Sequence, residues 1–215
     1  MGIPRWFSRR RQSKGHGVHS PFAFGLITKV LRSSHGYYAF FDIPEMLRDC
    51  GVEPGKVTSF NYLSFRLVRH FKAENILEIN SGKGVNTLFL LAPSPQIHCT
   101  CVEKDPACLS AARSLHERLL FTPSPGFSPP RFMGSLPPSS HEKPYDAIFV
   151  NINEEAPPHV DTLWELGHEN SFWVIHSIRE KQGKQFWKKI VNDERINVTF
   201  DMKEIGIAFP WPSLT

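Results

Sequence analysis

A glycine-bearing turn at residues 80–84 is the part of this sequence whose residue types could do chemistry. It follows an apolar run, Asn75–Ile79, that predicts a buried strand, and it precedes a segment that predicts the start of a helix. Ligands of open α/β sheets bind at the carboxyl ends of strands, where Gly82 and Gly84 would let backbone N–H groups approach closely. Glu103, at the end of the next predicted strand, would be placed to accept hydrogen bonds from ribose hydroxyls. Together these features predict a site for a nucleoside-containing cofactor.

The spacing of the glycines excludes two common nucleotide-binding motifs. A P-loop needs Gly-Lys-Ser/Thr after four spacer residues, a dinucleotide fingerprint needs Gly-x-Gly-x-x-Gly, and this stretch has neither. The run from Glu78 to Thr87, Glu-Ile-Asn-Ser-Gly-Lys-Gly-Val-Asn-Thr, instead resembles motif I of class I S-adenosylmethionine-dependent methyltransferases, especially their O-methyltransferase-like branch. The resemblance covers about residues 75–209. A second run, Gly15-His-Gly-Val-His-Ser-Pro-Phe, resembles the N-terminal signature of bacterial proteins assigned as methyltransferases.

This resemblance implies S-adenosyl-L-methionine as cofactor and a set of residues that would contact it. Those near the amino-acid and ribose parts would come from the turn: Glu78, Asn80, Ser81, Gly82 and Gly84. Glu103 would bind the ribose hydroxyls, and Gly134 and Ser135 would flank the adenine after the third strand. The residues alone leave alternatives open, since Glu78 could be a capped carboxylate at a strand end and Glu103 one half of a surface ion pair.

The sequence departs from motif I at Asn80, where glycine is usual. Asparagine tolerates the left-handed backbone conformation better than most residues do. We therefore expect cofactor binding to persist, in weakened form.

A second departure concerns the metal of metal-dependent O-methyltransferases. Asn151 stands where these enzymes carry an aspartate, and His176-Ser177 stands where an acidic pair is expected. A hard divalent cation prefers anionic oxygen ligands, so we expect no such metal site. Glu154 and Glu155 could replace the missing ligands, but we interpret them as a solvated loop.

Methyl transfer needs an acceptor nucleophile held in line with the sulfonium carbon, so catalysis could be mainly positioning. If the acceptor must be deprotonated, His176 is the best candidate base because imidazole titrates near neutral pH, and Asn151 is a second candidate catalytic residue. His159 is the reserve, and a purely structural histidine is the alternative for each. His16 and His19 make an incomplete metal site.

The rest of the chain predicts how these residues are held. From residue 75, short buried strands alternate with amphipathic segments, which predicts an α/β, Rossmann-like, doubly wound and mostly parallel sheet. The resemblance implies seven strands with an antiparallel strand at the C-terminus. The expected strands are Asn75–Ile79, Ile97–Glu103, Arg131–Met133, Tyr145–Asn151, Phe172–Ile178, Asn197–Phe200 and Ile205–Phe209. The expected helices are Ser20–Arg32, Ser59–Phe71, Val85–Leu91, Pro106–Leu120, Pro158–Leu166 and Gln182–Val191.

Composition limits the class of protein. The chain has 215 residues, 40% of them hydrophobic, which predicts a packed core. The four cysteines form no CxxC pair, so we expect reduced thiols. No run approaches the roughly 20 apolar residues of a membrane span, and the N-terminus lacks a secretory apolar core, so we expect a cytoplasmic protein. We divide the chain into a basic flexible tail (1–19), an N-terminal helical cover (20–74) and an S-adenosylmethionine-binding domain (75–215).

Three functional hypotheses follow. The first is a metal-independent methyltransferase acting on an unidentified acceptor, with a small molecule favoured. The second is a catalytically degenerate protein of this fold that serves as a binding or scaffold module. The third is nucleic-acid methylation helped by the basic tail, which we do not favour because the base-methylating motif Asn-Pro-Pro-Tyr is absent. The acceptor and the oligomeric state have no signature in the sequence.

Overall fold

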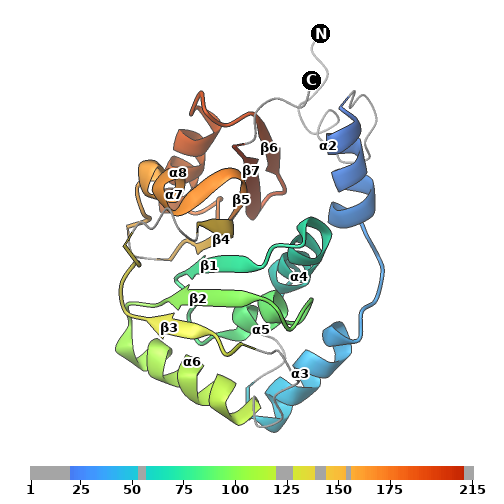
Figure 1. Ribbon diagram of the computed structural model, residues 1–215, viewed down its shortest axis with the longest axis vertical. Helices are drawn as coiled ribbons and strands as arrows, with labels where there is room; N and C mark the ends of the chain where they lie inside the picture. The colour runs from blue at the N-terminus through green and yellow to red at the C-terminus, as the bar shows by residue number, and fades with distance from the viewer. Residues whose placement is uncertain (1–19, 53–56, 120–127, 139–143, 154–155, 211–215) are drawn as a thin grey trace.

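A seven-stranded sheet with helices on both faces forms the centre of the computed structural model, which describes residues 20–52, 57–119, 128–138, 144–153 and 156–210 (Figure 1). The strand order is β3-β2-β1-β4-β5-β7-β6. Strands β1 to β5 are parallel, and β7 is antiparallel to both of its neighbours, so six strands run one way and one the other. This confirms the predicted doubly wound sheet. The strands are β1 (Asn75–Ile79), β2 (His98–Val102), β3 (Arg131–Met133), β4 (Tyr145–Asn151), β5 (Gly167–His176), β6 (Val198–Asp201) and β7 (Ile205–Phe209).

The helices also follow the predicted alternation from residue 59 onward. The described helices are α2 (Pro21–Leu26), η1 (Ile27–Leu31, a π-helix), α3 (Ala39–Asp49), α4 (Ser59–Phe71), α5 (Val85–Leu91), α6 (Pro106–Leu119), α7 (Val160–Leu166) and α8 (Lys181–Val191). None of them is long and apolar enough to span a membrane.

Three elements differ from the prediction. The single helix expected over Ser20–Arg32 is instead α2 followed by the π-helix η1. Helix α3 was not among the predicted helices, and it contains Pro44, a residue type that normally disrupts a helix interior. The helix nevertheless buries Ile43 and Leu47 on one face, and that packing outweighs the lost backbone hydrogen bond. Strand β5 begins five residues early, since Gly167 pairs with Tyr145 ahead of an irregularity in the ladder.

Apolar side chains fill both faces of the sheet. On one face, residues of α2, η1, α4 and α5 pack over Ile76, Phe149 and Phe172. On the other, α7 and α8 pack over Leu77, Ile148 and Trp173, and Figure 1 shows these two helices across the sheet from α4. Burial on both faces explains why the central strands are continuous apolar runs.

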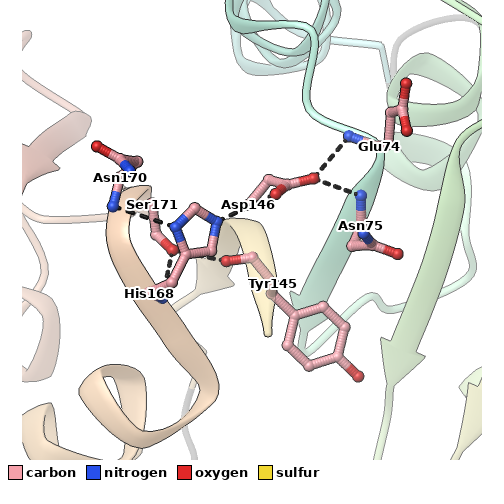
Figure 2. A network of polar contacts seen from close by, with 7 residues as sticks. All are labelled: Glu74, Asn75, Tyr145, Asp146, His168, Asn170 and Ser171. Carbon is pink, nitrogen blue, oxygen red and sulfur yellow. Dashed lines mark hydrogen bonds and ion pairs between the residues drawn. The ribbon is translucent and has the colours of Figure 1, made fainter. Parts of the chain in front are cut away.

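A polar network closes the amino edge of the sheet, opposite the carboxyl ends of the parallel strands. Figure 2 shows the carboxylate of Asp146, in β4, between the imidazole of His168 and the backbone of Glu74 and Asn75. Ser171 Oγ donates to the Tyr145 carbonyl at 2.6 Å. The network fixes β1, β4 and β5 relative to one another, which in turn fixes the positions of their carboxyl ends.

Candidate functional site

The turn after β1 has the backbone conformation that its residue types predict. Asn80, Gly82 and Gly84 have positive φ angles of 58°, 58° and 77°. Asparagine and glycine are the residues that adopt this region at the lowest cost. The turn therefore forms with asparagine in place of the usual glycine.

The Asn80 side chain has a role that glycine could not fill. Its Nδ2 donates to the Asn151 carbonyl at 2.8 Å and, at 3.4 Å, to Asn153 Oδ1. Asn80 itself is buried, and both bonds are partly buried. Asn80 thus ties the end of β1 to the end of β4.

Gly84 is needed for its size as well as its φ. A Cβ at this position would lie 3.0 Å from His116 Nε2 and 3.1 Å from Ala112 Cβ, both in α6. His116 Nε2 donates to the Gly84 carbonyl at 2.9 Å, which leaves Nδ1 unprotonated and without a partner among the described residues. Burial lowers the pKa of His116, although the bond to Gly84 opposes this. A neutral, buried histidine of α6 therefore packs against the turn and donates a hydrogen bond to it.

Glu78 is enclosed by side-chain donors. Asn86 Nδ2 donates to its Oε1 at 2.9 Å and Thr87 Oγ1 to its Oε2 at 2.6 Å. Asn86 in turn accepts from Asn61 Nδ2 at 3.0 Å, and Asn61 caps the first turn of α4 at Thr58. Burial raises the pKa of Glu78 to about 7, against these hydrogen bonds. The geometry matches the alternative of a capped strand-end carboxylate, because both oxygens face the protein.

Two cysteines adjoin this carboxylate. Cys101 Sγ lies 3.8 Å from Glu78 Oε2 and 3.6 Å from Cys99 Sγ. The ligand atoms of Glu78, Cys99 and Cys101 fall within 4.8 Å of one another in the described part of the chain, and all three residues are buried. All four cysteines are free of disulfides; Cys99 and Cys101 are buried in the core, whereas Cys50 and Cys108 are only half-buried.

Glu103 lies at the end of β2, beside the turn. The Gly82 N–H donates to its Oε2 at 2.7 Å, and the Asp105 N–H donates to its Oε1 at 2.9 Å. Each carboxylate oxygen retains a second lone pair for another donor. Glu103 is not half of an ion pair among the described residues, which removes the surface ion-pair alternative there.

Two features leave capacity for a ligand at this turn. Ser81 is buried, and its Oγ has no hydrogen-bond partner among the described residues. A Cβ at Gly82 would have no atom within 4 Å, so space lies directly beside the turn. An unsatisfied hydroxyl next to open space fits a polar ligand.

The structure brings the two candidate catalytic residues together at the next two strand ends. Asn151 and His176 are register partners in β4 and β5, and Asn151 Oδ1 lies 2.8 Å from His176 Nδ1. The imidazole stacks on Phe60 of α4, with ring centroids 4.4 Å apart. Burial lowers the pKa of His176, while Glu204 and Glu180 raise it by a smaller amount. The ring is thus held in one plane and kept neutral near pH 7.

The remaining predicted residues have no described contact with Asn151 or His176. Gly134 and Ser135 are exposed after β3, whose Met133 carbonyl accepts from the Glu103 N–H at 2.9 Å. His159 is exposed at the start of α7, and no described contact joins it to His176. His16, His19, Glu154 and Glu155 lie outside the described residues.

Comparison with known proteins rests on structure alone. No protein-family model matches the chain, and no curated protein matches its sequence. A methyltransferase from Podospora anserina bound to S-adenosylhomocysteine (SAH) is 14% identical, with a TM-score of 0.60 over 99% of this chain and 98% of its own. The O-methyltransferase TomG from Streptomyces achromogenes, bound to S-adenosylmethionine (SAM), is 14% identical, with a TM-score of 0.56 over 86% and 95%. The Bacillus cereus O-methyltransferase, bound to SAH, is 14% identical, with a TM-score of 0.55 over 85% and 94%.

The chain has the Rossmann-like methyltransferase fold. Within this fold, several residues that build the site were missed by sequence reasoning: Phe60, Asn61, Asn86 and His116. Only Asn61 carried a local signal, as the third residue after a Thr N-cap. The others act through contacts between distant segments that one sequence does not reveal.

Proposed function

We propose that this protein is an S-adenosylmethionine-dependent methyltransferase whose cofactor binds at the turn between β1 and α5. The observation that carries the proposal is the buried, unpartnered Ser81 hydroxyl beside the open space at Gly82, in the methyltransferase fold. Neighbours of this fold are bound to SAM or SAH. Residues 75–215 would form the cofactor-binding domain, with 20–74 as its helical cover.

The site residues divide by the part of the cofactor that they would hold. Ser81, Gly82 and Gly84 would line its amino-acid and ribose portion, and Asn80 would fix the turn. Glu103 would accept hydrogen bonds from the ribose hydroxyls through the second lone pair of each carboxylate oxygen. Gly134 and Ser135 would flank the adenine. Glu78 acts indirectly in this scheme, because Asn86 and Thr87 occupy its oxygens.

The bound cofactor would supply an electrophilic methyl group on a sulfonium. The task left to the chain is to position and deprotonate an acceptor hydroxyl. Because the Asn151 side-chain carbonyl oxygen accepts from His176 Nδ1–H, the lone pair of the ring is on Nε2. Nε2 has no hydrogen-bond partner among the described residues, and Phe60 fixes the plane of the ring, so this neutral imidazole can accept a proton from an acceptor hydroxyl.

We propose that the reaction needs no divalent metal. The strand ends that adjoin the turn present an amide at Asn151 and an imidazole at His176, and neither is an anionic oxygen ligand. A small-molecule acceptor bearing a hydroxyl is supported by the O-methyltransferases among the structural neighbours.

The second candidate function is a catalytically degenerate binding module. It is favoured by the Asn80 side chain, which bridges to Asn151 and Asn153 where glycine would leave space. Under this alternative the turn only connects the ends of β1 and β4 and does not bind the cofactor, and the fold serves as a scaffold.

Calorimetric titration with SAM and SAH tests the proposal. We expect micromolar binding that is unaffected by EDTA and is weakened about tenfold in Glu103→Gln, because one charged acceptor is lost. Glu117→Gln, at an exposed position of α6, is the matched control. If Asn80→Gly binds SAM or SAH and the wild type does not, the protein is the degenerate module. If neither the wild type nor Asn80→Gly binds, the cofactor site is refuted. Release of SAH in the presence of hydroxyl-bearing small molecules would then establish turnover.

A further inference from the structure

A cavity lies at the far end of α4 from the candidate site. Phe60, near the start of α4, stacks on His176, whereas Arg69 and His70 close the other end of the helix. At 1.5 Å per residue, Arg69 is about 14 Å along the helix axis from Phe60. The cavity measures about 260 Å³ and lies between α4, η1 and the segment that follows η1. Its lining residues are Lys29, Val30, Tyr37, Arg66, Arg69 and His70.

The lining is rich in basic side chains. Four of the six described lining residues carry basic side chains and none carries a carboxylate. Within the described part of the chain, no ion pair joins any of the four to an acidic residue. Burial, and then the charge of Lys29, lower the pKa of His70. The cavity is therefore a region of positive potential with no internal counter-charge.

The two guanidinium groups are held by contacts that leave donors available. Arg66 Nη1 donates to the Ser33 carbonyl at 2.6 Å, while its buried Nε has no partner among the described residues. Arg69 lies over the Tyr37 ring, 5.3 Å from its centroid. A guanidinium has five N–H donors, so a carbonyl and an aromatic face use only part of this capacity. Both arginines are oriented without being neutralised.

We propose that this cavity binds a phosphate group carried by a small molecule. Lys29, Arg66 and Arg69 carry three permanent positive charges, which a ligand with a single carboxylate would not balance. Paired guanidinium groups suit the several oxygens of a phosphate dianion. The volume of about 260 Å³ is below the usual range for drug-sized ligands, which favours a small phosphate ester over a larger ligand. The cations converge on one cavity rather than forming a stripe, which favours a compact phosphate ester over a nucleic acid. This site is separate from the cofactor turn and does not depend on the proposed methyl transfer.

Titrations of the full chain with inorganic phosphate, pyrophosphate and acetate test the assignment. We expect saturable binding of phosphate and tighter binding of pyrophosphate, with acetate weaker than both. Arg69→Gln and Lys29→Gln, at exposed positions that should not disturb folding, should each weaken pyrophosphate binding about tenfold, because each removes a charge-assisted contact. Arg48→Gln, on the exposed surface of α3, removes the same charge elsewhere and should leave affinity within about twofold.

The proton signals of the His70 imidazole locate the binding. They should shift with pyrophosphate in the wild type and in Arg48→Gln, and much less in Arg69→Gln. The proposal would be overturned by equal affinity for acetate and phosphate, by equal losses in Arg69→Gln and Arg48→Gln, or by an unchanged His70 signal at saturation. Tight binding of a single-stranded RNA that pyrophosphate does not displace would also overturn it, in favour of a polyanion surface.

Discussion

The Asp146 carboxylate lies 3.1 Å from His168 Nε2 at the amino edge of the sheet, and it serves three partners at once (Figure 2). Its Oδ2 accepts the backbone N–H groups of Glu74 and Asn75 at 2.9 and 2.8 Å. The Asn170 N–H donates to His168 Nδ1 at 3.1 Å, so Nε2 carries the proton and donates to Asp146. A single acidic side chain thus joins β4 to the start of β1 and to β5 on the side away from the candidate site.

Asp146→Asn should lower the free energy of unfolding by about 1–3 kcal/mol, because an amide has one acceptor oxygen where the carboxylate uses two. Depending on the orientation of the amide, its NH₂ group then faces either the backbone N–H groups of Glu74 and Asn75 or the His168 N–H, and in both cases two donors face each other. Urea denaturation measures the loss, with Asp49→Asn on the exposed surface of α3 as the matched control. Cofactor affinity should stay unchanged in the folded variant. Equal stability of the two variants would contradict a structural role for this network.

The turn glycines make a second, internally matched comparison. Gly82→Ala and Gly84→Ala both place a Cβ on a left-handed residue, which costs about 1–2 kcal/mol. Only Gly84→Ala also forces a Cβ against His116 and Ala112 of α6. We therefore expect Gly84→Ala to lose more stability in urea denaturation than Gly82→Ala, by about 1–3 kcal/mol for the added overpacking. Similar losses in the two variants would show that α6 moves to accommodate the added Cβ at no cost in the free energy of unfolding.

Much of this fold could be predicted from local patterns. The ranges of β1 and β4 were predicted because buried parallel strands are continuous apolar runs, and the left-handed Asn80 was anticipated from the residue type. Helix α3 was not predicted; Pro44 opposes a helix locally, whereas the packing of Leu47 that supports it is tertiary. The contact between Asn151 and His176 depends on the register of two strands 25 residues apart, and that of His116 with Gly84 on the packing of α6. Contacts between distant segments leave no periodic pattern in the sequence from which they could be predicted.

Glu78 should make stability depend on pH. Its pKa is raised from 4.5 to about 7 in the folded state, so the folded protein holds the proton more tightly than the unfolded chain does. The stability associated with the protonated form is fully present below about pH 4.5 and is lost as pH rises through 7, by on the order of 3 kcal/mol. Glu78→Gln should remove this loss, so the variant gains on the wild type between about pH 4 and pH 8 in urea denaturation. Glu117→Gln controls for the change in net charge, and parallel pH profiles of the wild type and Glu78→Gln would contradict burial of the charge.

The last prediction tests the environment and the role of His176 together. Asn151→Asp places a carboxylate beside Nδ1, where the amide oxygen now lies at 2.8 Å, with almost no change in shape. An adjacent negative charge favours the imidazolium, so the pKa of His176 should rise by about 1–2 units in a proton NMR titration, against the lowering that burial causes in the wild type. If His176 is the base, the low-pH limb of kcat/KM for SAH release should move to higher pH by the same amount, because the imidazole must be neutral to accept a proton. A raised pKa with an unmoved pH profile would leave His176 as a structural residue stacked on Phe60. An unmoved pKa would mean that the introduced carboxylate turns away from the ring and that the strand-end contact is not rigid.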